Sequence, residues 1–170
     1  MDIKINGMCV EVYESNELKY SFDIARLKSV WEFATEEAVE YIHASATPSE
    51  LLVALTSASD QDGIIAVIDI ANDEIIHYHK GSYVRCAVIA ENKVVSLHCV
   101  HYWGIYPYYC VESIDKSLKD MSKEPKQLKL SDDIKIDEVK YPELNIAVQN
   151  NTLTILNGEN KYDIDISEIL

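Results

Sequence analysis

Apolar and polar residues alternate along most of this chain in short runs that are separated by turn-forming residues. Runs of this length, bounded by Gly, Pro, Asn or Asp, are typical of β-strands. Four of them follow one another in the first half of the chain: Val39 to Ala44, Leu51 to Thr56, Ile64 to Ile70 and Glu74 to His79. Thr47-Pro48-Ser49, Gly63 and Asn72-Asp73 separate them. This stretch therefore predicts a four-strand antiparallel meander.

The same alternation continues toward both ends of the chain. Three runs predict a second unit: Tyr83 to Ala90, Lys93 to Val100 and Tyr108 to Ile114. Four more predict a third: Ile136 to Tyr141, Leu144 to Gln149, Thr152 to Leu156 and Tyr162 to Ile166. Two runs predict an N-terminal hairpin: Met8 to Tyr13 and Leu18 to Phe22. We expect one all-β, mostly antiparallel domain over residues 1–170, with three to four meander sheets and room for one or two short helices.

Two segments allow more than one structure. Apolar residues between Ile24 and His43 recur at spacings of three or four, which fits a helix with Thr35 as an N-cap. From Val39 onward, however, alternation fits a strand equally well, and we favour the strand there. Ser117 to Lys129 is predicted as either a helix or an exposed linker that carries Pro125.

The stretch from Glu36 to Ile70, with its even strand and turn spacing, resembles a blade of the tryptophan-aspartate type of β-propeller. That resemblance implies a small or incomplete propeller of about three to four blades, because such blades run about 40 to 45 residues. KYSFDI, Lys19 to Ile24, echoes KYDIDI, Lys161 to Ile166. This echo resembles propeller ring closure, in which N-terminal strands complete the last blade, but an open arc of sheets fits equally well.

Charge narrows the choice of partner. The 170 residues carry a formal net charge of -14, which disfavours nucleic acid and anionic membrane surfaces and favours a basic protein. Simple solubility explains such acidity equally well. The N-terminus lacks the pattern of a secretory signal, and no apolar run reaches the length of a membrane helix. Four cysteines without close pairing are typical of reduced, buried thiols, so we expect a cytoplasmic protein that does not bind membranes.

Partner contacts are predicted at two kinds of position. The segment from His101 to Tyr109 is unusually aromatic, and Tyr and Trp are enriched at the centres of protein interfaces; internal packing is the competing interpretation. Acidic residues in predicted turns are the second kind, with solvated turns as the alternative. The predicted contacts are Tyr102, Trp103, Tyr106, Tyr108, Asp60, Asp62, Asp73 and Glu74.

A catalytic or metal-binding interpretation depends on histidines and a cysteine in the middle of the chain: His77, His79, His98 and Cys110. His77 and His79 lie on one face of a strand, but spacing alone does not bring a third ligand to them. The chain has no G-x-S-x-G motif and no phosphate-binding glycine loop. We therefore expect no catalytic residues, no metal and no cofactor.

Small size, marked acidity, a β scaffold and the lack of a catalytic motif make the chain similar in overall character to the immunity proteins of bacterial toxin systems. This similarity depends on no shared motif. It implies that the chain binds and neutralises a basic toxin, such as a nuclease. The alternatives are a small metal- or ligand-binding protein or enzyme that uses the His and Cys residues, and a propeller-like scaffold subunit.

Overall fold

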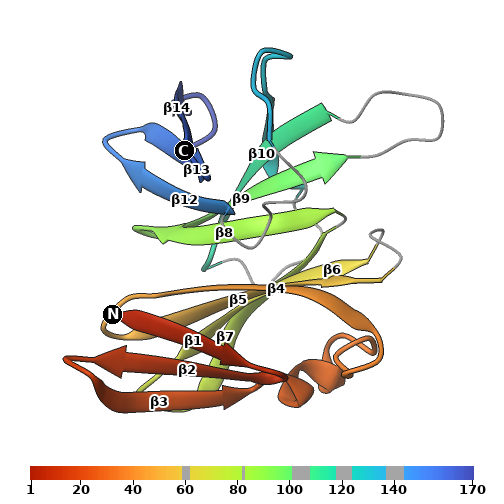
Figure 1. Cartoon of the computed structure of the whole chain (residues 1–170), viewed down its shortest axis with the longest axis vertical. Coiled ribbons are helices and arrows are strands. Elements are labelled where there is room, and N and C mark those ends of the chain that lie inside the picture. Colours follow the sequence, from red (N-terminus) through yellow and green to blue (C-terminus); the bar gives the residue numbers. More distant parts are fainter. Residues whose placement is uncertain (59–61, 82, 101–107, 118–123, 137–143) are drawn as a thin grey trace.

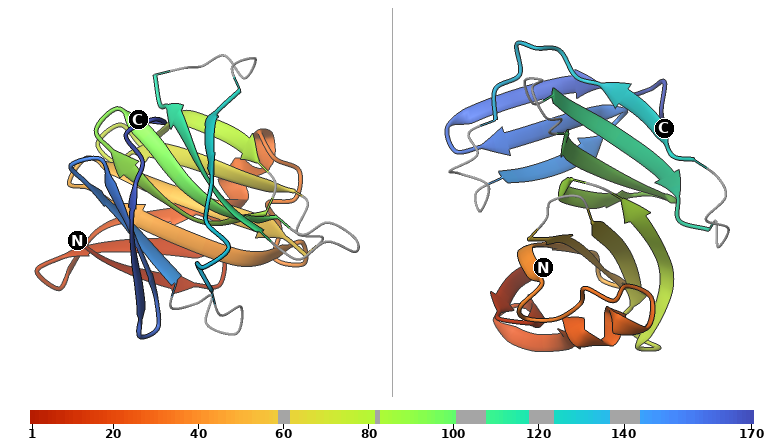
Figure 2. Two further views of the ribbon diagram at one scale, coloured as in Figure 1. Left: turned by 90° about the horizontal axis from the view of Figure 1, so that it is seen from above. Right: turned by 90° about the vertical axis from the view of Figure 1, so that its right-hand side faces the viewer.

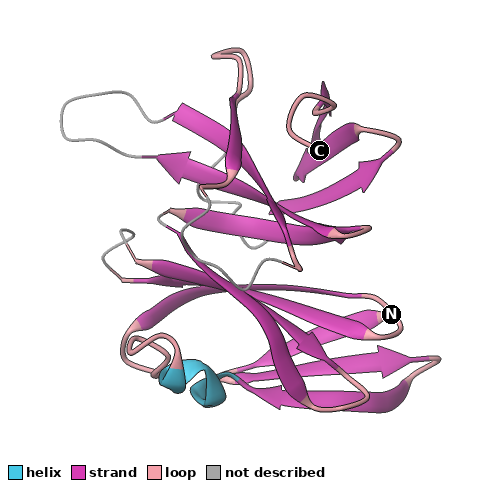
Figure 3. Cartoon of the chain, turned by 180° about the vertical axis from the view of Figure 1, so that it is seen from behind, coloured by secondary structure: helices cyan, strands magenta, loops and turns pink. Residues whose placement is uncertain are grey.

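The described residues form four antiparallel β-sheets, in chain order, and one short 3-10 helix (Figures 1 and 3). The computed structural model describes residues 1–58, 62–81, 83–100, 108–117, 124–136 and 144–170. We name the sheets A to D from the N-terminus. The predicted all-β, antiparallel class is confirmed, and so is the predicted organisation into meander sheets.

Each sheet is a simple up-and-down meander. Sheet A contains β1 (Asp2–Asn6), β2 (Cys9–Glu14) and β3 (Glu17–Asp23). Sheet B contains β4 (Val39–Ala46), β5 (Glu50–Ser57), β6 (Gly63–Asp69) and β7 (Glu74–Gly81). Sheet C contains β8 (Val84–Ala90), β9 (Lys93–Val100), β10 (Tyr108–Asp115) and β11 (Lys126–Lys129). Sheet D contains β12 (Leu144–Gln149), β13 (Thr152–Asn157) and β14 (Asn160–Asp165).

Two strands were not expected from the alternation of residues. The first is β1, which pairs with β2 and extends the predicted N-terminal hairpin to three strands. The second is β11, which pairs with β10 within the segment expected to be a helix or a linker. One expectation lies largely outside the described residues, because only Ile136 of the strand predicted at Ile136 to Tyr141 is described, and it is not in a strand.

The tight hairpins follow from residues that accept left-handed backbone geometry. Ser15 and Asn16, between β2 and β3, have φ of 52° and 66°. Asn150 and Asn151, between β12 and β13, have φ of 49° and 64°. Two successive positive φ values give the type I′ twist that matches flanking antiparallel strands, and Asn tolerates them better than most residues.

The ambiguous segment from Ile24 to His43 divides into a helix and a strand. A six-residue 3-10 helix, η1 (Ile24–Ser29), begins at Asp23, whose side chain accepts a 2.9 Å hydrogen bond from the Ala25 backbone N–H. The strand favoured from Val39 onward is confirmed as β4. The helical spacing of apolar residues arises because Ile24, Leu27 and Trp31 all turn into the core between sheets A and B.

The sequence echo marks equivalent strands. The first five residues of KYSFDI belong to β3 and those of KYDIDI to β14, each the third strand of a three-strand sheet. Asp165 accepts a hydrogen bond from Ser167 N–H at 2.9 Å, as Asp23 does from Ala25. The strands nearest the two termini pair only within sheets A and D, so the shared closing blade is not formed among the described strands.

Three apolar cores separate the four sheets, and the sheets follow one another from the N-terminal end of the molecule to the C-terminal end (Figure 2). The core between A and B includes Val53 and Ile64, and the core between B and C includes Leu52 and Ile65. Alternate residues of β5 and β6 thus enter different cores. This explains why the middle of each strand is apolar at every position, over residues 51–55 and 64–68, rather than alternating with polar residues.

The two outermost faces are polar. On sheet A, the Lys4 ammonium lies 4.4 Å from the centre of the Tyr13 ring, and the Asn6 amide donates to Glu11 at 2.9 Å. On sheet D, the Thr154 hydroxyl donates to Asp163 at 2.6 Å. Polar outward faces are what a sheet needs where only water covers it.

Candidate binding site

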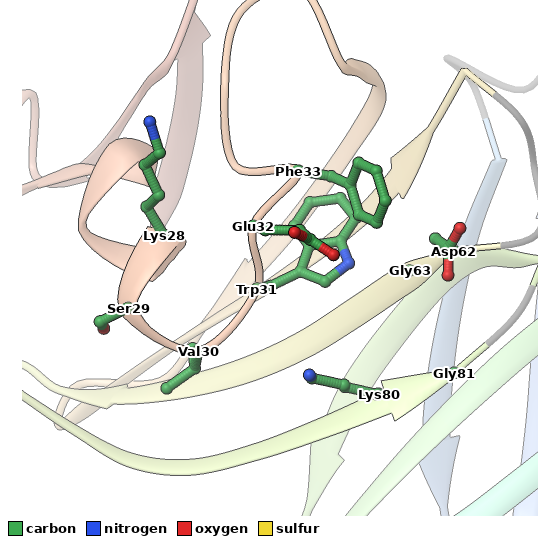
Figure 4. Close-up of a pocket in the computed structure, with 10 residues that line it drawn as sticks. All are labelled: Lys28, Ser29, Val30, Trp31, Glu32, Phe33, Asp62, Gly63, Lys80 and Gly81. Carbon is green, nitrogen blue, oxygen red and sulfur yellow. The ribbon is translucent and has the colours of Figure 1, made fainter.

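A pocket of about 450 Å³ lies at one end of sheet B, between the segment that follows η1 and the paired ends of β6 and β7 (Figure 4). Its lining residues come from one stretch of chain and from the paired ends of two strands: Lys28, Ser29, Val30, Trp31, Glu32, Phe33, Asp62, Gly63, Lys80 and Gly81. This volume is within the range of small-molecule and side-chain binding pockets.

Close strand packing forms the floor of this pocket. Gly63 pairs with Gly81, and a Cβ on Gly63 would lie 2.9 Å from the carbonyl oxygens of Gly81 and Leu55. Glycine is therefore required at residue 63 by sterics. Two backbone bonds fix the surrounding loops: Ser57 N–H to the Asp62 carbonyl at 2.8 Å and Ala58 N–H to the Ala38 carbonyl at 3.0 Å.

Trp31 forms the apolar wall. It is only 4% exposed, and its ring meets that of Phe33 edge to face, with centroids 5.8 Å apart. In Figure 4 the indole nitrogen lies on the side of the ring nearer Asp62 and Gly63. Within the described residues this N–H has no hydrogen-bond acceptor, and it is open to solvent, because it is not one of the buried polar atoms that lack a partner. The pocket therefore presents an unused donor.

The pocket also holds charges of both signs that form no ion pairs in the described parts of the chain: Lys28, Glu32, Asp62 and Lys80. Many charges elsewhere are paired, as in Glu14 with Lys19 and Asp163 with Lys161. Lys80 extends from β7 toward Val30, whereas Lys28 points away from the pocket (Figure 4). The groups turned toward the pocket can therefore both donate to and accept from a bound group.

Two further exposed carboxylates, Glu36 and Glu37, follow in the loop that Ala38 connects to the end of β5. We call Glu32, Glu36, Glu37 and Asp62 the acidic end of sheet B. All four residues are exposed. A surface of this kind attracts cationic partners over a distance of about one Debye length.

The predicted acidic contacts fall at opposite ends of the sheet. Asp62 belongs to the acidic end, whereas Asp73 and Glu74 lie where β6 and β7 are joined at the other end. Asp73 accepts a hydrogen bond from Tyr20 and from Arg26, the latter at 2.6 Å. These hydrogen bonds, with Tyr20 first and Arg26 second, lower the pKa of Asp73. The Asp73 carboxylate thus joins sheet A and η1 to sheet B.

Most of the predicted aromatic contacts, and Asp60, lie outside the described residues: Tyr102, Trp103, Tyr106 and Asp60. Tyr108 is described. It begins β10, is partly buried, and has the Lys129 ammonium 5.2 Å from its ring centre. Tyr108 pairs with Val100, and the Val84–His98 pair lies at the same end of these strands. His98 lies next to Gly81, which pairs with Gly63, the residue after Asp62. The described flank of the aromatic segment is therefore at the same end of the sheets as Asp62.

The histidines and cysteine of the catalytic interpretation face one another between sheets B and C. His98 pairs directly with Cys110, and the His98 Nε2 lies 3.3 Å from Glu112 Oε2. The His79 Nε2 lies 4.0 Å from the same oxygen. Burial lowers the pKa of His79, while the nearby Glu112 acts in the opposite direction. Sequence reasoning did not identify Glu112, which only pairing of β9 with β10 brings to His98.

The geometry at His98 does not match a catalytic triad. A triad needs the nucleophile on one ring nitrogen and the carboxylate on the other. Here Ser96 Oγ lies 2.8 Å from His98 Nε2, the nitrogen that also contacts Glu112. Glu112 in turn accepts a hydrogen bond from Gln127 at 2.6 Å. Ser96, His98, Glu112 and Gln127 thus form one hydrogen-bonded polar cluster.

No metal centre forms in the part of the chain that the structure describes, and burial keeps two of its cysteines as neutral thiols. No three His, Cys, Asp or Glu side chains there are placed to hold a metal ion. No described cysteine forms a disulfide bond. Burial raises the pKa of Cys86 far above its usual value and that of Cys110 to about 12, so neither thiol ionises readily near neutral pH.

A second hollow, of about 570 Å³, lies among the first strands of sheets A, B and D. Ile3 and Ile5 line one side, and Tyr41 and His43 line another. His43 Nδ1 accepts a long hydrogen bond, 3.4 Å, from the Ala87 backbone N–H of sheet C. Burial lowers the pKa of His43 to about 4, so the imidazole is neutral and connects the sheets.

Comparison with known proteins assigns no relationship: no family model matches the chain, and no curated protein matches it. Among the described residues, no helix is both long and apolar enough to cross a bilayer.

The pocket beside Trp31 was missed by sequence reasoning. A visible signal was the Trp31-Glu32-Phe33 triplet, which has two aromatic residues around an acid just after an irregular segment.

Proposed function

We propose that this protein is an acidic, non-catalytic binding module that neutralises a basic protein, in the manner of the immunity proteins of bacterial toxin systems. The observation that carries the proposal is the acidic end of sheet B. Its four exposed carboxylates have no ion-pair partner among the described residues. Two of them, Glu32 and Asp62, line a pocket with an aromatic wall, which is the combination of charge and anchor that protein interfaces use.

The net charge of -14 supports the same proposal. Long-range attraction would speed the encounter with a positively charged cleft, and short-range contacts at the pocket would then slow dissociation. A nuclease is one suitable partner, because its substrate-binding cleft is positive. Action in the cytoplasm, where such a toxin would harm its producer, belongs to this proposal.

The second part of the interface would be the aromatic segment, with Tyr102, Trp103, Tyr106 and Tyr108 as anchors. Its support is the position of Tyr108 at the same end of the sheets as Asp62. Asp73 and Glu74 have weaker support as contacts, because they lie at the opposite end and Asp73 is held by Arg26.

We further propose that the four sheets form an incomplete propeller arc. Two observations support this: the sheets follow chain order, and their first strands adjoin. Ser45 of β4 donates to the Ala87 carbonyl of β8 at 3.3 Å, and β1, β4 and β12 line a common hollow. A crystal structure whose first strands lie on the outside of the molecule would contradict the arc.

The functional test is protection from a toxin. The neighbouring gene would be expressed in a bacterial host in three ways: alone, with the wild-type protein, and with a fourfold variant of this protein. The variant carries Glu32→Gln, Glu36→Gln, Glu37→Gln and Asp62→Asn together. We expect that the neighbour encodes a basic toxin, that the wild type restores growth, and that the variant restores less. A neighbour that is harmless, or that remains toxic with the folded wild type present, would contradict the proposal.

A further inference from the structure

We infer that the pocket beside Trp31 is an anchor site for a peptide-borne arginine side chain, an inference that rests on the proposed function and specifies what the basic partner inserts. Two carboxylates from separate segments line the pocket: Glu32 after η1 and Asp62 before β6. A guanidinium has five N–H donors in a planar fork and matches carboxylates better than an ammonium does.

The aromatic wall suits the flat face of a guanidinium. Trp31 and Phe33 meet at an interplanar angle of 62°, and both line the pocket. Arginine stacks on such rings through cation–π attraction. The chain already contains one such contact, in which the Arg26 guanidinium lies 5.0 Å from the centre of the Phe22 ring.

The hydrogen-bond donors in the pocket favour an arginine that is part of a peptide over a free guanidinium ion. The Trp31 N–H and the exposed Lys80 ammonium can both donate hydrogen bonds to a ligand, and a guanidinium has no acceptor for them. The backbone carbonyls beside an arginine provide them. Lys80 would repel an isolated cation, so the pocket should bind arginine within a peptide better than free guanidinium.

The size of the pocket agrees with this occupant. About 450 Å³ accommodates one long side chain and its adjacent backbone. The Lys28 side chain points away from the pocket in Figure 4. The inference depends on no residue outside the described ranges.

The test uses acetyl-Gly-Arg-Gly-amide as the probe and follows the indole N–H signal of Trp31 by NMR. Trp103 is the only other tryptophan, so a Trp103→Phe variant assigns the signal. We expect a saturable shift of the Trp31 signal and binding roughly tenfold weaker for the matching citrulline peptide, which has the same shape without the charge. The lysine peptide should also bind more weakly.

Variants identify the carboxylates responsible. Glu32→Gln with Asp62→Asn should weaken binding of the arginine peptide roughly tenfold, whereas Glu36→Gln with Glu37→Gln, which removes the same charge outside the pocket, should change it little. Equal binding of the arginine and citrulline peptides, equal binding of the lysine peptide, or an unmoved Trp31 signal would overturn the inference.

The inference and the proposed function fail in different ways. If the basic partner binds the wild type and the Glu32→Gln, Asp62→Asn variant equally well, the function stands and the arginine site is overturned. If the arginine peptide binds but no toxin is neutralised, the site stands and the function is overturned.

Discussion

The ammonium of Lys116 contacts both carboxylate oxygens of Glu50, each at 2.7 Å. Glu50 begins β5 of sheet B, and Lys116 follows β10 of sheet C. The side chains are 17% and 22% exposed, so water screens the pair less than it screens surface ion pairs. The contact therefore connects two sheets that otherwise pack mainly through apolar side chains.

Removing either partner of this ion pair should weaken the fold. Glu50→Gln or Lys116→Met should each lower the free energy of unfolding by about 1–2 kcal/mol, because the remaining charge stays partly buried. The double variant should lose less than the sum of the two single losses. Urea unfolding of all four proteins measures this coupling. Additive losses would show that the ion pair does not stabilise the packing of sheet B on sheet C.

The Asp73 contacts predict a pH dependence with a definite sign. The pKa of Asp73 is lowered in the folded state, chiefly by the Tyr20 hydrogen bond and then by Arg26. Its contribution to stability is therefore present above the ordinary carboxyl pKa, near 3.8, and is lost as pH falls through the lower folded value.

The test compares the wild type with Asp73→Asn by urea unfolding between about pH 6 and pH 3. The wild type should be the more stable protein at the upper end, and the difference should shrink toward the lower end. Glu74→Gln is the matched control, because this neighbour is exposed at the same turn. A constant difference across the range would contradict the assigned role of Asp73.

His43 should act in the same direction as Asp73, but over a higher pH range. Its folded pKa is lowered from 6.5 to about 4, so as pH falls the unfolded chain takes up the proton first. Stability should therefore drop between about pH 6.5 and pH 4, by at most roughly 3 kcal/mol from this residue. A His43→Gln variant should have a shallower dependence in urea unfolding across that window. Parallel curves for the two proteins would contradict this assignment.

Gly63 should tolerate no side chain. A Cβ there would lie 2.9 Å from two backbone oxygens, whereas a Cβ on Gly81 would meet only side-chain atoms, at 3.3 and 3.4 Å for the two nearest. Gly63→Ala should cost roughly 2 kcal/mol or more in thermal or urea unfolding, and Gly81→Ala distinctly less. Equal effects would mean that the strand spacing at the pocket floor relaxes easily.

The sequence predicts most strands well because the alternation of apolar and polar residues, and the turn residues between the runs, match the strands and turns that form. Alternation and turn residues locate most strands of sheets B and D, and two positive φ values at Ser15 and Asn16 agree with the predicted N-terminal hairpin. Alternation could not predict β11, because Lys126–Lys129 becomes a strand only through pairing with β10. Short polar edge strands depend on tertiary contacts more than on propensity.

The candidate site was only partly predictable for the same reason. Asp62 was identified from its turn, but its neighbours Glu32 and Lys80 come from distant segments. The lack of ion pairs that distinguishes these charges is a property of three-dimensional placement. Likewise, Ser96 and Glu112 contact the same nitrogen of His98 only after strand pairing, so the sequence could not predict this polar cluster.

The association rate with the basic neighbouring-gene product, measured by stopped flow at about 50 mM and about 300 mM NaCl, tests the central claim most directly. We predict that the wild-type rate falls by roughly tenfold or more over this range. A variant that neutralises Glu32, Glu36, Glu37 and Asp62 should start slower and change less. A wild-type rate that is indifferent to salt, or equal to that of the variant, would contradict recognition of a basic partner through the acidic end.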